Sequence, residues 1–518
     1  MAVVMLPARR VVWCLVVATV ATVALYWPSL SFDFYADDYL YLRPWTWEEL
    51  RTAWAGPWLP FPTAPPFHRP VATTLYTALF GLFGMNAAAM HWLPLPLMIL
   101  TASLVGLYIG RMLDDDHAAW LGSLLFVILP GSVTAIGPWI VNQYHGILAL
   151  TAVTAWLLWP RTHHASPRRW IVLTMLGVVA AWTKEDGAML PLATVFGHAV
   201  AAWWNRDSHR PGWPVIGAAC GLFVAVFAWR MFVLGTFGGY SWWPTPLDMV
   251  LNLARGVLWI PLVQRGALPW SAIATALTIA LCVHGAWQAW RRPAAPTTRL
   301  FVFAGVALLV FVLPHSLMTS VTRGHLLSLA SVVLLTAAAT PWLRGGLLPR
   351  AALATGLVAL AMVSSERMQA FAPCSAEALY ELRWVTPDVR AFGPPELADW
   401  LEDLPACAAG TRRSLVEEVE TLTWGLTAPS TRVVMLVHQH VQQVQWSVSS
   451  DTTQRVTLRV EGQPWQEMEV GPEPRTIDVT LTPTWRTSLR RMHRVEIVAP
   501  HPTRWTSRVA VTTRTTRE

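Results

Sequence analysis

Long hydrophobic runs separated by short polar segments dominate the first 364 residues of the chain. An α-helix needs ~20 predominantly apolar residues to cross a bilayer, and eleven runs approach that length. The eleven runs cover approximately residues 11–29, 89–111, 118–136, 139–159, 170–183, 187–204, 213–234, 268–290, 300–318, 325–343 and 349–364. The pattern predicts a polytopic α-helical membrane domain over residues 1–364, with about eleven transmembrane helices.

Composition and charge support this class and suggest an orientation. Of the 518 residues, 54% are hydrophobic and 13% are charged, whereas soluble domains carry about 25% charged residues. Short loops with excess arginine face the cytoplasm, and placing Arg9 and Arg10 there puts five arginine-bearing loops on the same side. These loops hold Arg111; Arg161, Arg168 and Arg169; Arg206 and Arg210; Arg291, Arg292 and Arg299; and Arg344 and Arg350. We therefore expect a multi-pass inner (plasma) membrane protein with a cytoplasmic N-terminus.

The first extracytoplasmic loop of this topology, residues 31–88, contains two adjacent carboxylates, Asp37 and Asp38. A cleaved signal peptide is the alternative for the preceding run, but no small-residue cleavage site precedes the acidic pair. Residues 45–54 and 70–84 have the pattern of short helices that lie on the membrane or re-enter it. On the cytoplasmic side, residues 114–116 are three aspartates that read as a solvated loop.

The tail of the chain has the pattern of an extracytoplasmic soluble domain. Residues 365–430 are predicted to form a helical connector, and residues 431–518 contain short β-rich runs separated by Gly and Pro. Val456, Leu458 and Val460 alternate with polar residues, which is the period of a half-buried strand. We expect a mixed domain, mainly a β-sandwich.

The cysteines and the basic residues exclude some functions. Cys374 and Cys407 fall in the predicted exported region, where a disulfide can persist; a bridge and two free thiols are both compatible with the sequence. No zinc-ligand spacing, P-loop or GxGxxG motif is present. The net charge of +7 belongs to the membrane loops, so no nucleic-acid partner is expected.

Three basic residues on the predicted external face are candidates for binding a lipid-linked phosphate. Lys184 is the only lysine of the chain, Arg323 lies between two apolar spans, and Arg69 precedes Pro70. Cations that face a membrane interior suit a phosphate or diphosphate headgroup. The structural alternatives are an ion pair of Lys184 with Glu185 or Asp186, and snorkelling of the arginines to the interface.

Taken in order, these elements resemble the bacterial polytopic glycosyltransferases of the GT-C fold, which are related to protein O-mannosyltransferases and to the transmembrane mannosyltransferases with tetratricopeptide repeats. The resemblance covers about residues 10–345. It rests on Asp37-Asp38, on His68-Arg69-Pro70, on FGMNAAAMHW with His91, on Lys184-Glu185 ahead of Pro191, and on Arg323. The chain differs in having PWIVNQYHG, with Asn142, Gln143 and His145, in having Gly324, His325 and Ser328 after Arg323, and in lacking a tetratricopeptide pattern.

The resemblance implies a hexosyltransferase that moves a sugar from a polyprenyl-phosphate donor to a protein, lipid or glycan acceptor outside the cytoplasm. It implies that Asp37 is the general base that takes the proton of the acceptor hydroxyl. Asp38 would orient Asp37 or join it in a metal site, and adjacent carboxylates can hold a divalent cation such as Mg²⁺ or Mn²⁺, so metal dependence stays open.

The same resemblance implies roles for the remaining residues. Lys184 and Arg323, with Arg69 in support, would stabilise the negative charge that the departing polyprenyl phosphate gains. Glu185 would hold Lys184 in place, and His91 would have a supporting role. His68, His91, His145, His315 and His325 lie near the same predicted face, but none shows close metal-ligand spacing with another.

Other classes of function remain open at this stage. A transporter or flippase of lipid-linked saccharides would also be polytopic, although it would show ionisable groups near the bilayer midplane and repeat symmetry. A non-catalytic envelope scaffold that binds glycan through the β domain is a second alternative. An enzyme resembling O-antigen ligases is a third, although its long external loop comes late in the chain.

Overall fold

The computed structural model describes residues 7–31, 45–56, 67–83, 87–136, 140, 142–159, 167–206, 211–234, 246–257, 269–316, 325–371, 389–393, 419–425, 430–437, 441–460, 463–480, 493–503 and 505–513. The contacts divide the chain into two compact units. One unit holds the described helices and the other holds the described strands. Each is described by itself below.

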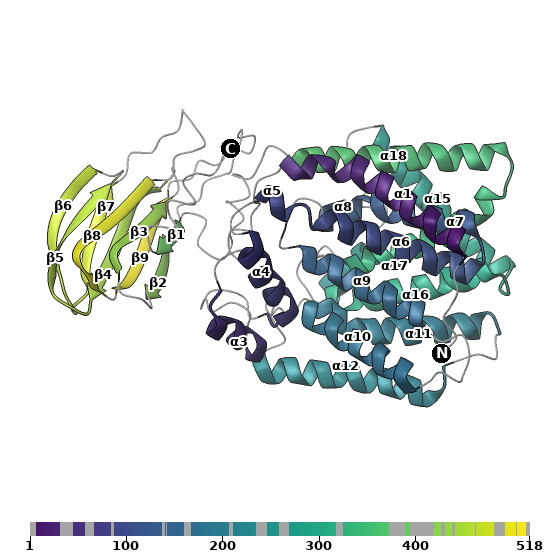
Figure 1. The fold of residues 1–518 in the computed structure, drawn as a ribbon, viewed down its shortest axis with the longest axis horizontal. Coiled ribbons are helices and arrows are strands. Elements are labelled where there is room, and N and C mark those ends of the chain that lie inside the picture. The colour runs from purple at the N-terminus through teal and green to yellow at the C-terminus, as the bar shows by residue number, and fades with distance from the viewer. Residues whose placement is uncertain are drawn as a thin grey trace. The chain divides into compact units, whose positions relative to one another are not determined.

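The helical unit is a bundle of long helices with several short ones at one end (Figure 1). Its elements are α1 (Ala8–Tyr26), η1 (Trp27–Ser31), α3 (Trp47–Ala55), α4 (Pro70–Phe83), α5 (Ala87–Met90), α6 (Pro94–Leu113), α7 (Asp116–Ile128), α8 (Pro130–Ile136), α9 (Gln143–Leu158), α10 (Pro167–Thr183), η2 (Glu185–Met189), α11 (Leu190–Trp204), α12 (Trp213–Leu234), α13 (Pro246–Val257), α15 (Trp270–Arg291), α16 (Pro296–Ser316), α17 (His325–Leu343) and α18 (Leu347–Phe371).

Eight helices within the described part of the chain are long and apolar enough to cross a membrane. They correspond to eight of the eleven predicted spans. The other three predicted spans are also helical but shorter, because Pro130 divides the run at 118–136 into α7 and α8, and α9 and α10 have 16 and 17 residues. The structure therefore shows the multi-pass helical class, while the count of eleven transmembrane helices stays a prediction.

Local sequence signals explain where several helices begin. Proline occupies the first position of α4 and α6, where its missing N–H leaves no helical hydrogen bond unmade. Thr46 and Glu49 form a capping box at the start of α3. Two of the predicted short helices, at 45–54 and 70–84, are thus present as α3 and α4.

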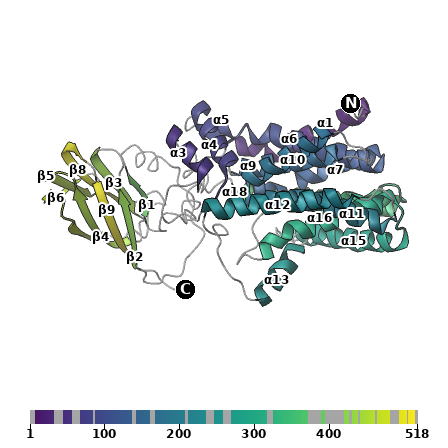
Figure 2. The same ribbon diagram turned by 90° about the horizontal axis from the view of Figure 1, so that it is seen from below.

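The spans differ greatly in how much of their surface other helices cover. In α17, 83% of the apolar window is buried, whereas the corresponding share in α12 is 11%. α12 runs along the outer edge of the bundle in Figure 1, and in the turned view it extends along the length of the bundle (Figure 2). α12 therefore exposes most of its apolar surface to the surroundings of the helical unit.

The β unit contains two antiparallel sheets. Five strands have the order β1-β3-β8-β5-β6 and four have the order β2-β9-β4-β7. Their bounds are β1 Val389–Gly393, β2 Val419–Gly425, β3 Ser430–Val437, β4 Val441–Ser450, β5 Gln454–Val460, β6 Gln463–Val470, β7 Arg475–Thr480, β8 His493–Thr503 and β9 Trp505–Thr513. Val456 and Leu458 are buried, as their alternation with polar residues predicts. The packing of the two sheets as a sandwich stays a prediction.

The predicted helical connector at 365–430 is wrong over two stretches, which form the strands β1 and β2. The physical reason is non-local pairing: β2 pairs with β9, with Val419 opposite Thr512 and Gly425 opposite Thr506. The paired residues lie more than eighty positions apart in the sequence. The local sequence around β2 therefore could not indicate that it pairs with β9 as a strand. At the other boundary, α18 continues to Phe371, past the predicted domain end at residue 364.

Candidate functional site

Four of the predicted site residues lie in the described part of the chain: Arg69, Lys184, Glu185 and His91. Asp37, Asp38, Arg323, Cys374 and Cys407 lie outside the described residues. The four described residues all belong to the end of the helical unit where α4 and α6 begin and α10 ends. We refer to this part of the molecule as the Arg69 end.

Arg69 and Glu185 form a bidentate ion pair that joins distant parts of the sequence. Nε of Arg69 donates to both carboxylate oxygens at 2.9 and 3.1 Å, and Nη2 donates to Oε2 at 2.6 Å. The Arg69 guanidinium also lies 4.1 Å from the ring centroid of Phe67 and 5.3 Å from that of Tyr144. Charge-assisted bidentate pairs fix geometry as well as adding energy, so α4, η2 and the start of α9 are held together here.

Lys184 forms an ion pair with Asp186, one of the two partners named as structural alternatives. Its Nζ donates to Oδ2 of Asp186 at 2.7 Å, and both side chains are buried. The Glu185 carboxylate accepts from the guanidinium groups of Arg69 and Arg230, and Asp186 binds the ammonium. The role of Glu185 in holding Lys184 stays a prediction. The extended backbone at Lys184 and the 3₁₀ turn that follows direct Lys184 and Asp186 toward each other.

A glycine makes this turn possible. A Cβ atom added at Gly187 would lie 1.9 Å from the carbonyl oxygen of Ala180, near the end of α10. No side chain fits at that distance, so η2 approaches the backbone of α10 closely only because residue 187 is glycine. Gly187 thus positions Lys184, Glu185 and Asp186 without contributing chemistry of its own.

Arg230 is the residue that the sequence analysis missed. It lies near the end of α12 and is 7% exposed. Nη2 donates to Oε1 of Glu185 at 2.8 Å and to the carbonyl oxygen of His68 at 3.0 Å. The available signal was a charged residue inside an apolar run, which is rare in membrane helices and is associated with function.

Two buried histidines, His68 and His91, lie at the Arg69 end. His68 donates from Nδ1 to the carbonyl oxygen of Gly56 at 2.9 Å, and burial lowers the pKa of His68. His91 is fully buried in the turn before α6. Among the described residues no group of three or more His, Cys, Asp or Glu side chains could hold a metal ion. The proposed metal ligands Asp37 and Asp38 lie outside those residues.

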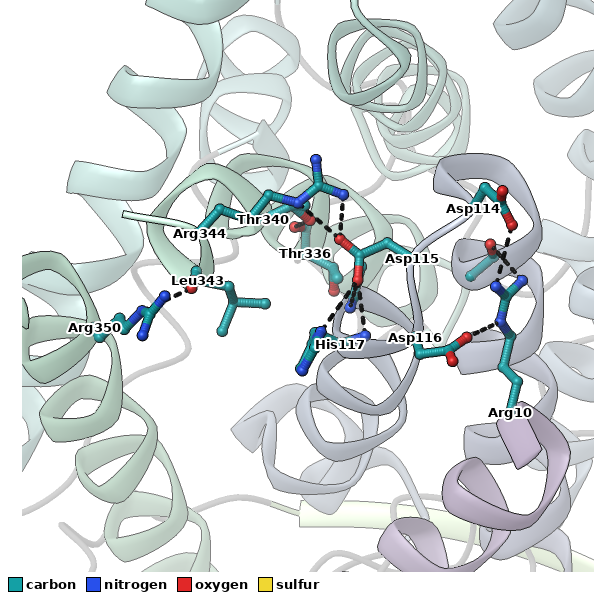
Figure 3. A network of polar contacts seen from close by, with 12 residues as sticks. Arg10, Asp114, Asp115, Asp116, His117, Thr336, Thr340, Leu343, Arg344 and Arg350 are labelled. Atoms are coloured by element: carbon teal, nitrogen blue, oxygen red, sulfur yellow. Dashed lines mark hydrogen bonds and ion pairs between the residues drawn. The ribbon is translucent and has the colours of Figure 1, made fainter. Parts of the chain in front are cut away.

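The opposite end of the helical unit carries a second polar network, drawn in Figure 3. The three aspartates at 114–116 were expected to be a solvated loop, but Asp115 is buried, caps α7 through the backbone N–H groups of His117 and Ala118, and accepts from Nε of Arg344 at 3.1 Å. Asp114 and Asp116 pair with Arg10. The network joins α1, α7 and the end of α17, so its role is structural.

The Asp115 carboxyl group has a perturbed pKa. Burial acts to raise it, but the hydrogen bonds from Arg344 and from the backbone of Ala118 and His117 outweigh burial and lower the pKa below its usual value. Asp115 is therefore held in its charged form at the junction of α6 and α7.

No known protein family matches this sequence, and no curated protein matches it. Several solved structures do. The oligosaccharyltransferase of Archaeoglobus fulgidus, in complex with zinc and sulfate, has a TM-score of 0.44 and 15% identity over 72% of this chain and 56% of that chain. ArnT from Cupriavidus metallidurans bound to undecaprenyl phosphate has a TM-score of 0.39 and 15% identity over 72% of this chain and 77% of that chain.

A further match is the arabinosyltransferase EmbB from Mycobacterium smegmatis, with a TM-score of 0.35 and 10% identity over 100% of this chain and 66% of that chain. The match to the oligosaccharyltransferase covers 56% of that protein, so this chain spans little more than half of its length. The names of that protein and of the arabinosyltransferase describe the transfer of saccharide groups by those proteins.

Proposed function

We propose that the protein is a membrane glycosyltransferase that moves a sugar from a polyprenyl-phosphate donor to an acceptor on the extracytoplasmic side. The observation that carries the proposal is the gathering of three buried cations, Arg69, Lys184 and Arg230, around Glu185 and Asp186. Buried guanidinium and ammonium groups are expensive unless they meet anions. Preorganised cations of this kind suit a phosphate whose charge grows as the sugar leaves.

Each residue has a distinct role in this proposal. Lys184 and Arg69 stabilise the departing phosphate, with Arg323 as a third cation. Asp37 accepts the proton of the acceptor hydroxyl, and Asp38 orients it or joins it in binding a divalent cation. Glu185, occupied by two guanidinium groups, is a positioning residue and a poor proton acceptor, which leaves the base role to the acidic pair.

The decisive experiment is a transfer assay with the full chain in lipid nanodiscs, a panel of polyprenyl-phosphate hexoses as donors, and peptide, lipid and glycan acceptors. Asp37→Asn should reduce transfer by at least about a hundredfold, because general-base catalysis contributes that much, while donor binding is retained. Transfer at the wild-type rate in Asp37→Asn would remove the base assignment. Absence of transfer with every donor would remove the enzyme proposal.

A transporter of lipid-linked saccharides is the alternative function. The Arg230–Glu185 pair brings charged groups to two segments that are apolar enough to span a membrane, with Glu185 at the start of one and Arg230 near the end of the other. The two functions separate in detergent solution, where no sidedness exists. Sugar transfer in detergent supports the enzyme, whereas movement of a lipid-linked saccharide across a sealed vesicle without transfer supports the flippase.

A further inference from the structure

We propose that Arg230 is a ligand of the donor phosphate, and that the phosphate enters by replacing the Glu185 carboxylate on Arg230 and Arg69. This inference rests on the proposed function and extends it to a residue on a different helix. It assigns to Glu185 the role of an internal anion that occupies the phosphate position when donor is absent.

Arg230 is a buried cation on a helix that the rest of the bundle covers little. α12 has few buried side chains, and the described ones are Ala219, Val226 and Arg230. A guanidinium among apolar residues of a possible membrane span is costly, and its presence calls for a specific partner. Arg230 turns inward, toward Glu185 and the carbonyl oxygens of His68 and Ala181.

Two arginines converge on the Glu185 carboxylate. Arg230 donates to Oε1 and Arg69 donates to both oxygens, with its shortest contact to Oε2. Arg69 binds the carboxylate in a bidentate manner and Arg230 adds a single contact. A phosphate also presents oxygen pairs that arginine binds in a bidentate manner, so the two guanidinium groups suit either anion. The same two arginines can therefore exchange one anion for the other with small movements.

The helix that carries Arg230 exposes an apolar surface suited to a membrane. The outer surface of α12 exposes large apolar side chains, including Val224, Trp229 and Phe232. A lipid-linked donor keeps its tail in the bilayer. Arg230 is the basic residue among the described residues of α12, the helix whose outer surface is apolar. A headgroup arriving from the bilayer beside α12 would reach Arg230 and Glu185 without crossing the buried core.

A purely structural ion triad is the competing explanation, since removing one member of a buried triad destabilises a protein whatever its function. The two explanations differ in the effect of Glu185→Gln. Loss of a structural partner weakens the site. Loss of a competing anion leaves Arg69 and Arg230 available and strengthens phosphate binding.

The test measures binding of undecaprenyl phosphate to the full chain in phosphatidylcholine nanodiscs, which requires no transfer. Arg230→Gln should weaken binding about tenfold or more, as expected for a lost charged hydrogen bond, and Arg230→Lys should recover part of it. Glu185→Gln should bind at least as tightly as wild type. Arg10→Gln, which removes a buried arginine at the opposite end, is the matched control and should bind as wild type.

Several outcomes overturn the inference. Unchanged binding in Arg230→Gln, or equal loss in Glu185→Gln and Arg230→Gln, leaves only a structural triad, while transfer by the wild-type protein still supports the proposed function. Absence of any binding by the wild-type protein removes both proposals. Equal competition by phosphatidylglycerol or inorganic phosphate would show a general anion site in place of a donor site.

Discussion

Arg230 and Glu185, forty-five positions apart in the sequence, form a hydrogen-bonded ion pair in which Nη2 lies 2.8 Å from Oε1. The pair attaches the most exposed of the described spans, α12, to the turn that carries Lys184 and Asp186. Because Arg69 binds the same carboxylate, one glutamate connects three segments of the Arg69 end.

Lys184→Ala should lower the catalytic efficiency with a polyprenyl-phosphate donor. The change removes a preorganised cation, and such donors contribute on the order of 3 kcal/mol, or roughly a hundredfold in rate. Lys184→Arg should recover little, because a guanidinium differs from an ammonium in shape and hydration. Initial transfer rates at several donor concentrations provide the measurement. Kinetics unchanged from wild type in both variants would place the phosphate site elsewhere.

Gly187→Ala should destabilise the helical unit and disturb the Arg69 end together. The added Cβ would lie 1.9 Å from the Ala180 carbonyl oxygen, so η2 must move away from α10. We expect a loss of about 2 kcal/mol or more in unfolding free energy, as for other severe steric changes. The measurement is thermal unfolding in detergent.

Gly217→Ala provides the matched control for that variant. A Cβ at Gly217 in α12 meets nothing within 4 Å, and alanine favours a helix over glycine by up to about 1 kcal/mol. The control should therefore unfold at the same temperature as wild type or slightly higher. A Gly187→Ala protein as stable as the control would contradict the close approach of η2 to α10.

Asp115 should make the stability of the helical unit depend on acidic pH. Its pKa is lowered in the folded protein, so its contribution is present above the unfolded value of about 4 and is lost as the pH falls through the folded value. Asn caps a helix as well as Asp does, so Asp115→Asn should lower stability at neutral pH by up to about 1 kcal/mol through the lost ion pair with Arg344. The variant should also lose less stability than wild type as the pH falls. Asp114→Asn is the control because Asp114 is 96% exposed. If both variants lost the same amount of stability as the pH falls, Asp115 would be excluded as the cause of that loss.

The orientation of the chain can be tested by labelling cysteines from one side of intact cells. His163→Cys and Glu467→Cys, each in a background without native cysteines, should react on opposite sides, because the charge pattern places the loop at 161–169 in the cytoplasm and the β unit outside. A membrane-impermeant maleimide should label residue 467 in cells and residue 163 only after permeabilisation. Labelling of both residues from the same side would overturn the topology.

The sequence by itself determined the class of the protein. Apolar runs of bilayer length are local in the chain, and each of the eleven predicted runs contains a helix, eight of them long enough to be candidate spans. The alternating strand pattern likewise predicted β5 and its neighbours, because one buried face leaves a mark every second residue. β2 was missed, because it lies in the stretch 365–430 that was predicted to be helical.

Only the tertiary structure decided which charged groups meet. The sequence singled out Arg69, Lys184 and Glu185 but could not show that Glu185 binds Arg69 and Arg230 while Asp186 binds Lys184. It also could not show that Asp115 is buried and paired with Arg344. The physical reason is that ion pairing depends on distances between helices. Those distances are fixed by packing across the whole bundle, whereas residue type and spacing describe only neighbours along the chain.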